Sequence, residues 1–170
     1  MSASSPRPHF STRTKARKAA LDVLFEADLR DEPPLAILHD HVLAAEIPMR
    51  EYTAVLVEGV VANLRQIDGR LAEALDNGWS LERMPRVDRA LARIAVFEID
   101  HGGIAPKVAI AEALVLAGEL STDESPSFLN GVLSGVVKAP LMDEAQVEAV
   151  HADVLSEAER AGESSSEDLD

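Results

Sequence analysis

Residues 52–75 read YTAVLVEGVVANLRQIDGRLAEAL, and their apolar side chains recur every three or four positions. One stripe contains Tyr52, Leu56, Val60, Leu64, Ile67, Leu71 and Leu75, while charged side chains occupy the opposite face. This period is typical of an amphipathic α-helix that packs one face against a core. The pattern predicts a single helix from about Arg50 to Asp76, ended by the Asn77-Gly78 pair.

The same period recurs on both sides of this segment, between breaks at proline and glycine. The first helix is expected to begin near residues 12–14 and to end near 30, and further helices span about 35–45, 87–100, 106–120 and 125–139. Ser125 is expected to cap the last of these, with Pro126 as its first helical residue. A weaker amphipathic pattern follows at 147–158, and no segment alternates as a strand requires. The sequence therefore predicts an all-α fold, a helical bundle of about seven helices.

Composition excludes several classes of protein. The chain of 170 residues contains no cysteine, which rules out disulfides and thiolate metal sites. No stretch approaches the ~20 apolar residues of a membrane-spanning helix, and residues 1–10 lack the apolar segment of a signal peptide. We expect a cytoplasmic protein in three parts: a flexible basic arm at 1–12, a helical domain at 13–140, and an acidic, partly disordered extension at 141–170.

The formal net charge of −14 is distributed unevenly along the chain. Residues 1–20 contain five basic residues and no acid, whereas residues 143–170 contain ten acids and one base. The cations Arg13, Lys15, Arg17 and Lys18 lie at a helix start, where they oppose the helix macrodipole, and RNA phosphates would offset that cost. If five cations met single-stranded phosphates, the salt slope would be about −3.5. The alternative interpretation is an ordinary solvated first turn.

The sequence contains no recognisable catalytic machinery. It lacks a glycine-rich phosphate loop, an HExxH motif and a nucleophile elbow. His39 and His41 are two residues apart and point in different directions on a helix, so they do not predict a metal site. We expect a binding protein without cofactor or metal, not an enzyme.

Two aromatic residues have alternative interpretations. The lone Trp79 and Phe128 are able to stack on RNA bases. For either residue taken alone, burial in the hydrophobic core is the favoured interpretation.

Several segments read together resemble the NusB family of bacterial transcription antitermination factors. They are ARKAALDVLFEADLR (16–30), the segment 52–75 quoted above, GWSLERMPRVDRALARIAVFEI (78–99) and PKVAIAEALVLAGELSTDESPSFLNGVLSGVV (106–137). The most specific parts are VDRALARIAVFEI and SPSFLNGVL, because each combines charged, aromatic or amide residues with helical spacing.

The resemblance implies both a fold and a function. The fold is two three-helix bundles, with the basic helix opening the first. The function is binding of the boxA element of nascent ribosomal RNA transcripts together with NusE, a small-subunit ribosomal protein that doubles as a transcription factor. The pair acts within the RNA polymerase antitermination complex and promotes read-through of terminators.

The resemblance also implies roles for individual residues. The RNA surface falls on Arg13, Lys15, Arg17, Lys18, Glu124, Ser125 and Phe128, and the NusE surface falls on Phe25 and Asp88. The chain departs from many relatives at Ala111, where they carry Asn, and its basic arm is thinner than in some of them. The thinner arm makes us expect that RNA binding depends on NusE.

Three further possibilities remain open at this point. Some RNA cytosine methyltransferases carry a NusB-like accessory domain ahead of a catalytic one. Some relatives dimerise, so the chain is also compatible with an interaction module whose homodimer hides the RNA surface. The acidic extension either folds back on the basic arm and competes with RNA or serves only as a solubilising end.

Overall fold

The structure is a computed structural model that describes residues 10–76 and 78–139, together with residues 141, 145, 148, 149, 152 and 156. The chain divides into two compact units, 1–138 and 139–170. Most of the expected basic arm, and most of the expected acidic extension with its weak helix, lie outside the described residues.

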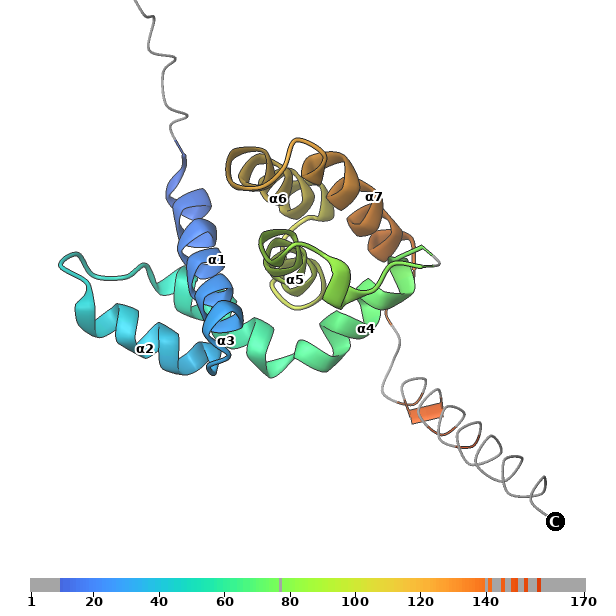
Figure 1. The fold of residues 1–170 in the computed structure, drawn as a ribbon, viewed down its shortest axis with the longest axis horizontal. Coiled ribbons are helices and arrows are strands. Elements are labelled where there is room, and N and C mark those ends of the chain that lie inside the picture. The colour runs from blue at the N-terminus through green and yellow to red at the C-terminus, as the bar shows by residue number, and fades with distance from the viewer. Residues whose placement is uncertain are drawn as a thin grey trace, which may run out of the picture. The chain divides into compact units, whose positions relative to one another are not determined.

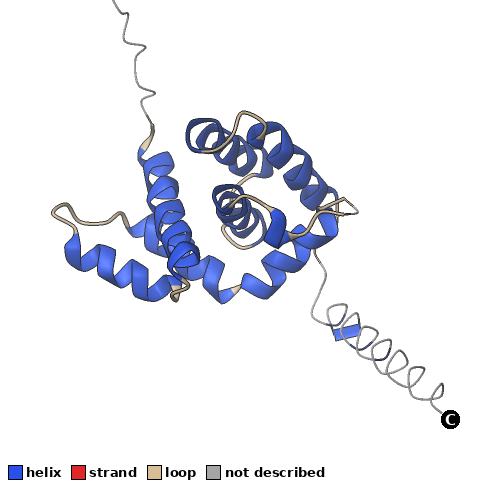
Figure 2. Ribbon diagram, viewed as in Figure 1, coloured by secondary structure: helices blue, strands red, loops and turns tan. Residues whose placement is uncertain are grey.

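The described part of the first unit is built from helices and their connections, with no strand (Figure 2). The helices are α1 (Thr12–Arg30), α2 (Pro34–Ala44), α3 (Glu51–Ala62), α4 (Leu64–Ala74), the short 3-10 helix η1 (Leu81–Arg83), α5 (Arg86–Asp100), α6 (Pro106–Leu120) and α7 (Ser125–Lys138). The expected all-α class is confirmed, and the boundaries of α1, α2, α5, α6 and α7 lie within a few residues of those predicted from periodicity. None of the helices among the described residues combines the length and the apolar character needed to cross a bilayer.

The single helix expected over 50–76 is wrong, because the structure divides it into α3 and α4 at Asn63. Asn63 adopts φ −115° and ψ 17°, and its side-chain Nδ2 donates to the Gly59 carbonyl oxygen at 2.8 Å. Asparagine side chains compete with the backbone for such hydrogen bonds, which weakens a helix interior. The direction of the chain changes at this point (Figure 1). The apolar stripe continues through the break, which is why periodicity alone did not show it.

The helices form two groups that meet on α5. Helices α1, α2 and α3 pack against one another and form the first group. The second group contains α4, α5, α6 and α7, which is one helix more than the three-helix bundle expected. Figure 1 shows α5 almost end-on, surrounded by α1, α4, α6 and α7. Helix α5 also contacts α3, and the approach is close at Gly59, where an added Cβ would lie 2.1 Å from Phe97 Cζ. The core therefore depends on α5, which touches both groups.

Candidate nucleic-acid interface

The first turns of α1 place their cations in different environments. The Ser11 hydroxyl accepts a hydrogen bond from the Thr14 backbone N–H at 3.1 Å and caps the helix. Arg13 and Lys15 are exposed, and Lys18 is half-buried and pairs with Asp22 at 2.9 Å. Residues 13 and 15 of the basic cluster are thus exposed, and residue 18 is partly accessible.

Arg17 does not share this surface. It is 4% exposed, and its guanidinium forms a buried ion pair with Glu98 of α5. The Arg17 Nε lies 2.9 and 3.1 Å from the two Glu98 carboxylate oxygens, and Nη2 lies 2.8 Å from Oε1. In this conformation the Arg17 charge is satisfied inside the domain, so its position favours a structural role over the phosphate contact expected from the resemblance.

Further residues complete the network around Arg17. Arg17 Nη1 lies 3.4 Å from Glu112 of α6, and that carboxylate also accepts from the Thr14 hydroxyl at 2.8 Å. The Tyr52 hydroxyl of α3 donates to Glu98. The network therefore connects α1, α3, α5 and α6. Among the described residues, every buried side-chain nitrogen or oxygen has a hydrogen-bond partner.

The network alters the acid–base properties of its members. Burial raises the pKa of Tyr52 to about 12. The hydrogen bond to Glu98 and the negative charge of Glu98 act in the same direction. Burial acts to lower the pKa of Arg17, but the hydrogen bond and charge of Glu98 outweigh it and leave the pKa raised. On the outer side, the Arg13 guanidinium lies 4.0 Å from the Tyr52 ring centroid. Tyr52 thus separates an exposed cation from a buried one.

The start of α7 contains a second buried polar node. Asp88, in the first turn of α5, accepts from the Ser121 hydroxyl at 2.7 Å and from the Ser125 hydroxyl at 2.8 Å. Asp88 is 2% exposed and Ser125 is 1% exposed. The two residues were expected on different surfaces, Asp88 toward NusE and Ser125 toward RNA, yet the structure places them in direct contact inside the domain.

Ser125 also differs from its expected role in the helix. It is the first residue of α7, and its hydroxyl bonds Asp88 and Thr122. The backbone N–H of Phe128 donates to the Glu124 carbonyl at 3.0 Å, so α7 starts one residue earlier than the predicted cap implied. Ser125 therefore ties the start of α7 to α5.

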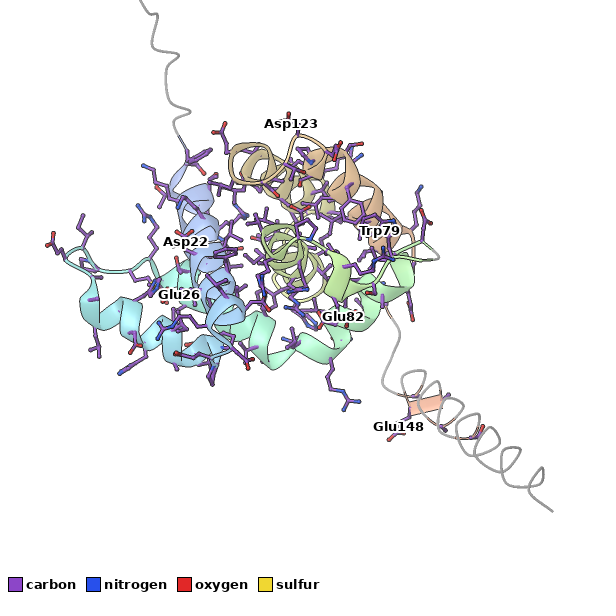
Figure 3. All side chains as sticks on the ribbon, viewed as in Figure 1. Asp22, Glu26, Trp79, Glu82, Asp123 and Glu148 are labelled. Atoms are coloured by element: carbon purple, nitrogen blue, oxygen red, sulfur yellow. The ribbon has the colours of Figure 1, made fainter. Side chains whose placement is uncertain are left out.

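The remaining residues at the start of α7 lie nearer the surface. Glu124 is exposed, and Phe128 is partly buried against the core. The Phe128 ring centroid lies 5.5 Å from that of Trp79, which is in the connection between α4 and η1 beside α7 (Figure 3). Trp79 is 51% exposed, so the favoured expectation of its burial is wrong.

Phe25, the aromatic residue expected to meet NusE, lies half-buried in the second half of α1. Its neighbour Leu24 lines a groove of about 190 Å³ between α1, α3 and α5. Charged residues at the groove are paired across helices, since Asp28 of α1 lies 2.8 Å from both Arg86 and Arg89 of α5. Phe25 and the basic start of α1 therefore occupy different parts of the same helix.

A family model for the NusB family matches residues 14–138, which cover all seven α-helices apart from the first two residues of α1. This chain belongs to the NusB family.

Curated relatives agree with that assignment. The transcription antitermination protein NusB of Acidothermus cellulolyticus is 54% identical over 125 residues, which cover 73% of this chain and 86% of the relative. The corresponding protein of Salinispora arenicola is 51% identical over 130 residues, which cover 74% of this chain and 95% of the relative.

Solved NusB structures share the fold. Thermotoga maritima NusB superimposes with a TM-score of 0.68 at 28% identity, covering 82% of this chain and 99% of that one. A crystal structure of the antitermination factors NusB and NusE in complex with double-stranded RNA gives a TM-score of 0.67 at 29% identity. The match covers 75% of this chain and 97% of that one.

Several residues of this region were not singled out from the sequence. Glu98 and Glu112 lie within the segments that carry the resemblance, but nothing local distinguishes them from the many solvated carboxylates of the chain. Tyr52 was assigned only to an apolar stripe. The one available signal was a charge on an apolar helix face: Glu98 lies four residues after Ile94 and seven after Leu91 on the most buried helix.

Proposed function

We propose that this protein is an RNA-binding transcription antitermination factor, which binds boxA RNA of ribosomal RNA operons together with NusE and promotes read-through by RNA polymerase. The observation that carries the proposal is the start of α1 in a NusB-family chain, where Arg13 and Lys15 are exposed beside an inward-facing Arg17. Curated relatives named as antitermination proteins and a similar structure with NusE and RNA support it. The proposed role is cytoplasmic binding without a catalytic step or cofactor.

The proposal assigns different tasks to the residues of the interface. Arg13, Lys15 and Lys18 contact phosphates, while Glu124 and Phe128 contact bases, which single-stranded RNA exposes. Arg17 positions α1 through Glu98, and Ser125 positions the start of α7 through Asp88. Phosphate contacts of Arg13, Lys15 and Lys18 alone would give a salt slope of about −2.

On the protein side, Phe25 is the proposed direct contact for NusE, because part of its ring remains accessible. Asp88 is proposed to act on NusE binding indirectly, since its carboxylate is buried against two serine hydroxyls.

The proposal is tested by measuring the affinity of the full chain for labelled boxA RNA, with and without NusE, at 50 and 200 mM salt. We expect binding that is stronger with NusE and weakens with salt. The test variant reverses Arg13 and Lys15 to Glu, because reversal of Arg17 would also disrupt the buried ion pair. Arg65→Glu is the matched control, since Arg65 is an exposed cation on α4.

The proposal predicts loss of binding in the double reversal and near wild-type binding in Arg65→Glu, with the same helicity in both. Equal RNA binding by the double reversal and the wild type would contradict it. A scrambled single strand and a double-stranded boxA RNA establish which form is preferred. Light scattering of the same samples shows whether a homodimer persists unchanged when RNA is saturating, which would count against the idea that a dimer hides the RNA surface.

A further inference from the structure

The indole of Trp79 is a half-exposed apolar surface in the connection between α4 and η1. Trp79 is the only tryptophan of the chain and follows Gly78, whose φ of +98° turns the backbone. The Trp79 backbone N–H donates to the Asp76 carbonyl at 3.0 Å, and Arg83 Nη1 donates to the Gly78 carbonyl at 2.6 Å. Both hydrogen bonds hold the peptide unit between Gly78 and Trp79, although half of the side chain faces solvent.

Two side chains accompany the indole. The Phe128 ring of α7 lies at a centroid distance of 5.5 Å and an interplanar angle of 45°, and the guanidinium carbon of Arg83 lies 5.6 Å from the indole centroid. Both distances fall within the ranges of aromatic pairing and cation–π contact. Arg83 is itself exposed. Trp79, Phe128 and Arg83 thus place two aromatic rings side by side with a cation at the edge. We call these three residues the aromatic step.

We propose that the aromatic step is an RNA-contact site that accepts one unpaired base, which stacks on Trp79, while Arg83 meets an adjacent phosphate. This inference rests on the proposed function and extends its RNA surface from α7 to the α4–η1 connection. Base–aromatic stacking needs no particular base, because every base has a π-face, and an arginine beside the ring suits both stacking and phosphate contact.

Two observations favour RNA over a protein partner. The step is continuous with Phe128, the residue at the start of α7 that the proposed function places against RNA bases. It also carries a cation in contact with an aromatic ring, on a chain whose formal net charge is −14. The neighbouring Glu82 and Glu124 are exposed acids, which repel a phosphate chain and leave stacking of a base as the main attraction.

The lone tryptophan provides a direct test with the full chain, NusE and a fluorescein-labelled single-stranded boxA RNA. Anisotropy of the label measures binding, and emission of Trp79 excited at 295 nm, with the Trp79→Phe complex as blank, reports on the indole. We expect unlabelled boxA RNA to quench Trp79 with a midpoint equal to the Kd from anisotropy. Trp79→Ala should weaken binding about 5- to 100-fold, and Trp79→Phe should retain most of it.

Leu43→Ala is the matched control, since Leu43 is an exposed apolar residue on α2 and its loss should leave the Kd unchanged. Wild-type RNA binding with no change in indole emission and an unaltered Kd for Trp79→Ala would overturn the inference and leave the proposed function standing. A Trp79→Ala variant that loses NusE but keeps RNA would overturn it in favour of a protein contact. If the wild type with NusE binds no RNA at 50 mM salt, both the proposed function and the inference fail.

Discussion

The first two turns of α1 carry four basic residues. The start of α7 is instead formed by Glu124, just before the helix, and by two serines and Phe128. Both helix starts bury one polar residue that reaches α5: Arg17 bonds Glu98, and Ser125 bonds Asp88. Arg13, Lys15 and Lys18 near one anchor, and Glu124 and Phe128 near the other, remain exposed or half-buried. The two starts are thus built alike. At each, a buried side chain bonded to α5 holds the helix in place, and neighbouring side chains form the surface.

The difference lies in the chemistry of each start. At α1 the anchor is a buried ion pair and the surface is cationic, so contacts made there with RNA should depend strongly on salt. At α7 the anchor joins hydroxyls to one carboxylate, and the surface is aromatic, so contacts made there should depend little on salt. The comparison teaches that the candidate RNA surface and the stability of the domain depend on different residues at each start, and single substitutions can test this.

The largest expected effect is that of Arg17→Ala, which leaves the Glu98 carboxylate buried without its cation. Removal of one partner of a buried ion pair costs about 3–5 kcal/mol. We expect a loss of that size in the free energy of unfolding, measured with urea. Lys15→Ala, an exposed cation of the same helix, should change it by no more than about 0.5 kcal/mol. Equal stability of the two variants would show that the anchor at α1 is unimportant.

A smaller loss is expected at the other anchor from Asp88→Ala. The hydroxyls of Ser121 and Ser125 lose their acceptor, and an unsatisfied buried group costs about 1–3 kcal/mol. Asp123→Ala, in the exposed connection before α7 (Figure 3), is the control and should be near neutral. Asp88→Asn keeps an acceptor oxygen and separates the roles: weak NusE binding with normal stability would mean that Asp88 contacts the partner directly.

The third prediction concerns Tyr52, the only tyrosine, which reports on the α1 anchor. Its folded pKa of about 12 lies above the unfolded value of 10, so the folded state keeps the phenol proton longer. The stabilising contribution is complete below pH 10 and is lost as pH rises from 10 to 12. Phenolate absorbance at 295 nm should therefore appear about two pH units later in the folded chain than in urea.

Glu98→Gln is the check on the cause of that shift. Because the negative charge of Glu98 raises the Tyr52 pKa, the variant should titrate at lower pH than the wild type. A Tyr52 titration near pH 10 in the folded wild type would contradict the burial and hydrogen bonding described at this anchor.

The smallest expected effect distinguishes the two surfaces by salt. Lys15→Ala should reduce the magnitude of the logarithmic salt slope of RNA binding by about 0.7, the contribution of one phosphate contact. Phe128→Ala should weaken binding at every salt concentration and leave the slope unchanged. The slopes come from affinities at several salt concentrations between 50 and 300 mM. A changed slope for Phe128→Ala would show that the two starts are not chemically distinct.

The residues of the candidate interface could be proposed from the sequence, but the direction of individual side chains could not. The basic cluster and the aromatic at the start of α7 were identified by residue type and by resemblance. Arg13 and Arg17 are four residues apart and lie on one side of the helix, so periodicity assigns them alike. They separate because the Tyr52 ring, which comes from another helix, contacts both guanidinium groups, with Arg13 on the exposed side and Arg17 paired with Glu98 on the buried side.

Trp79 illustrates the opposite error. A large apolar side chain is expected to be buried in the hydrophobic core. Its neighbours follow this expectation, since Met84 is buried there and Leu81 packs against it. The turn at Gly78 and the bond from Arg83 to the Gly78 carbonyl direct the indole outward instead. Loop conformation of this kind depends on contacts between residues that have no periodic pattern.

The sequence by itself determined the all-α class, most helix boundaries and the family, because apolar periodicity, proline and glycine breaks, and motif spacing are local properties. Only the tertiary structure decided which polar residues are anchors and which are surface. Arg17 meets Glu98 across 81 positions of the chain, and Ser125 meets Asp88 across 37. Such pairs form only when the helices pack, since the free energy of a buried charge or hydroxyl depends on the partner that packing brings to it.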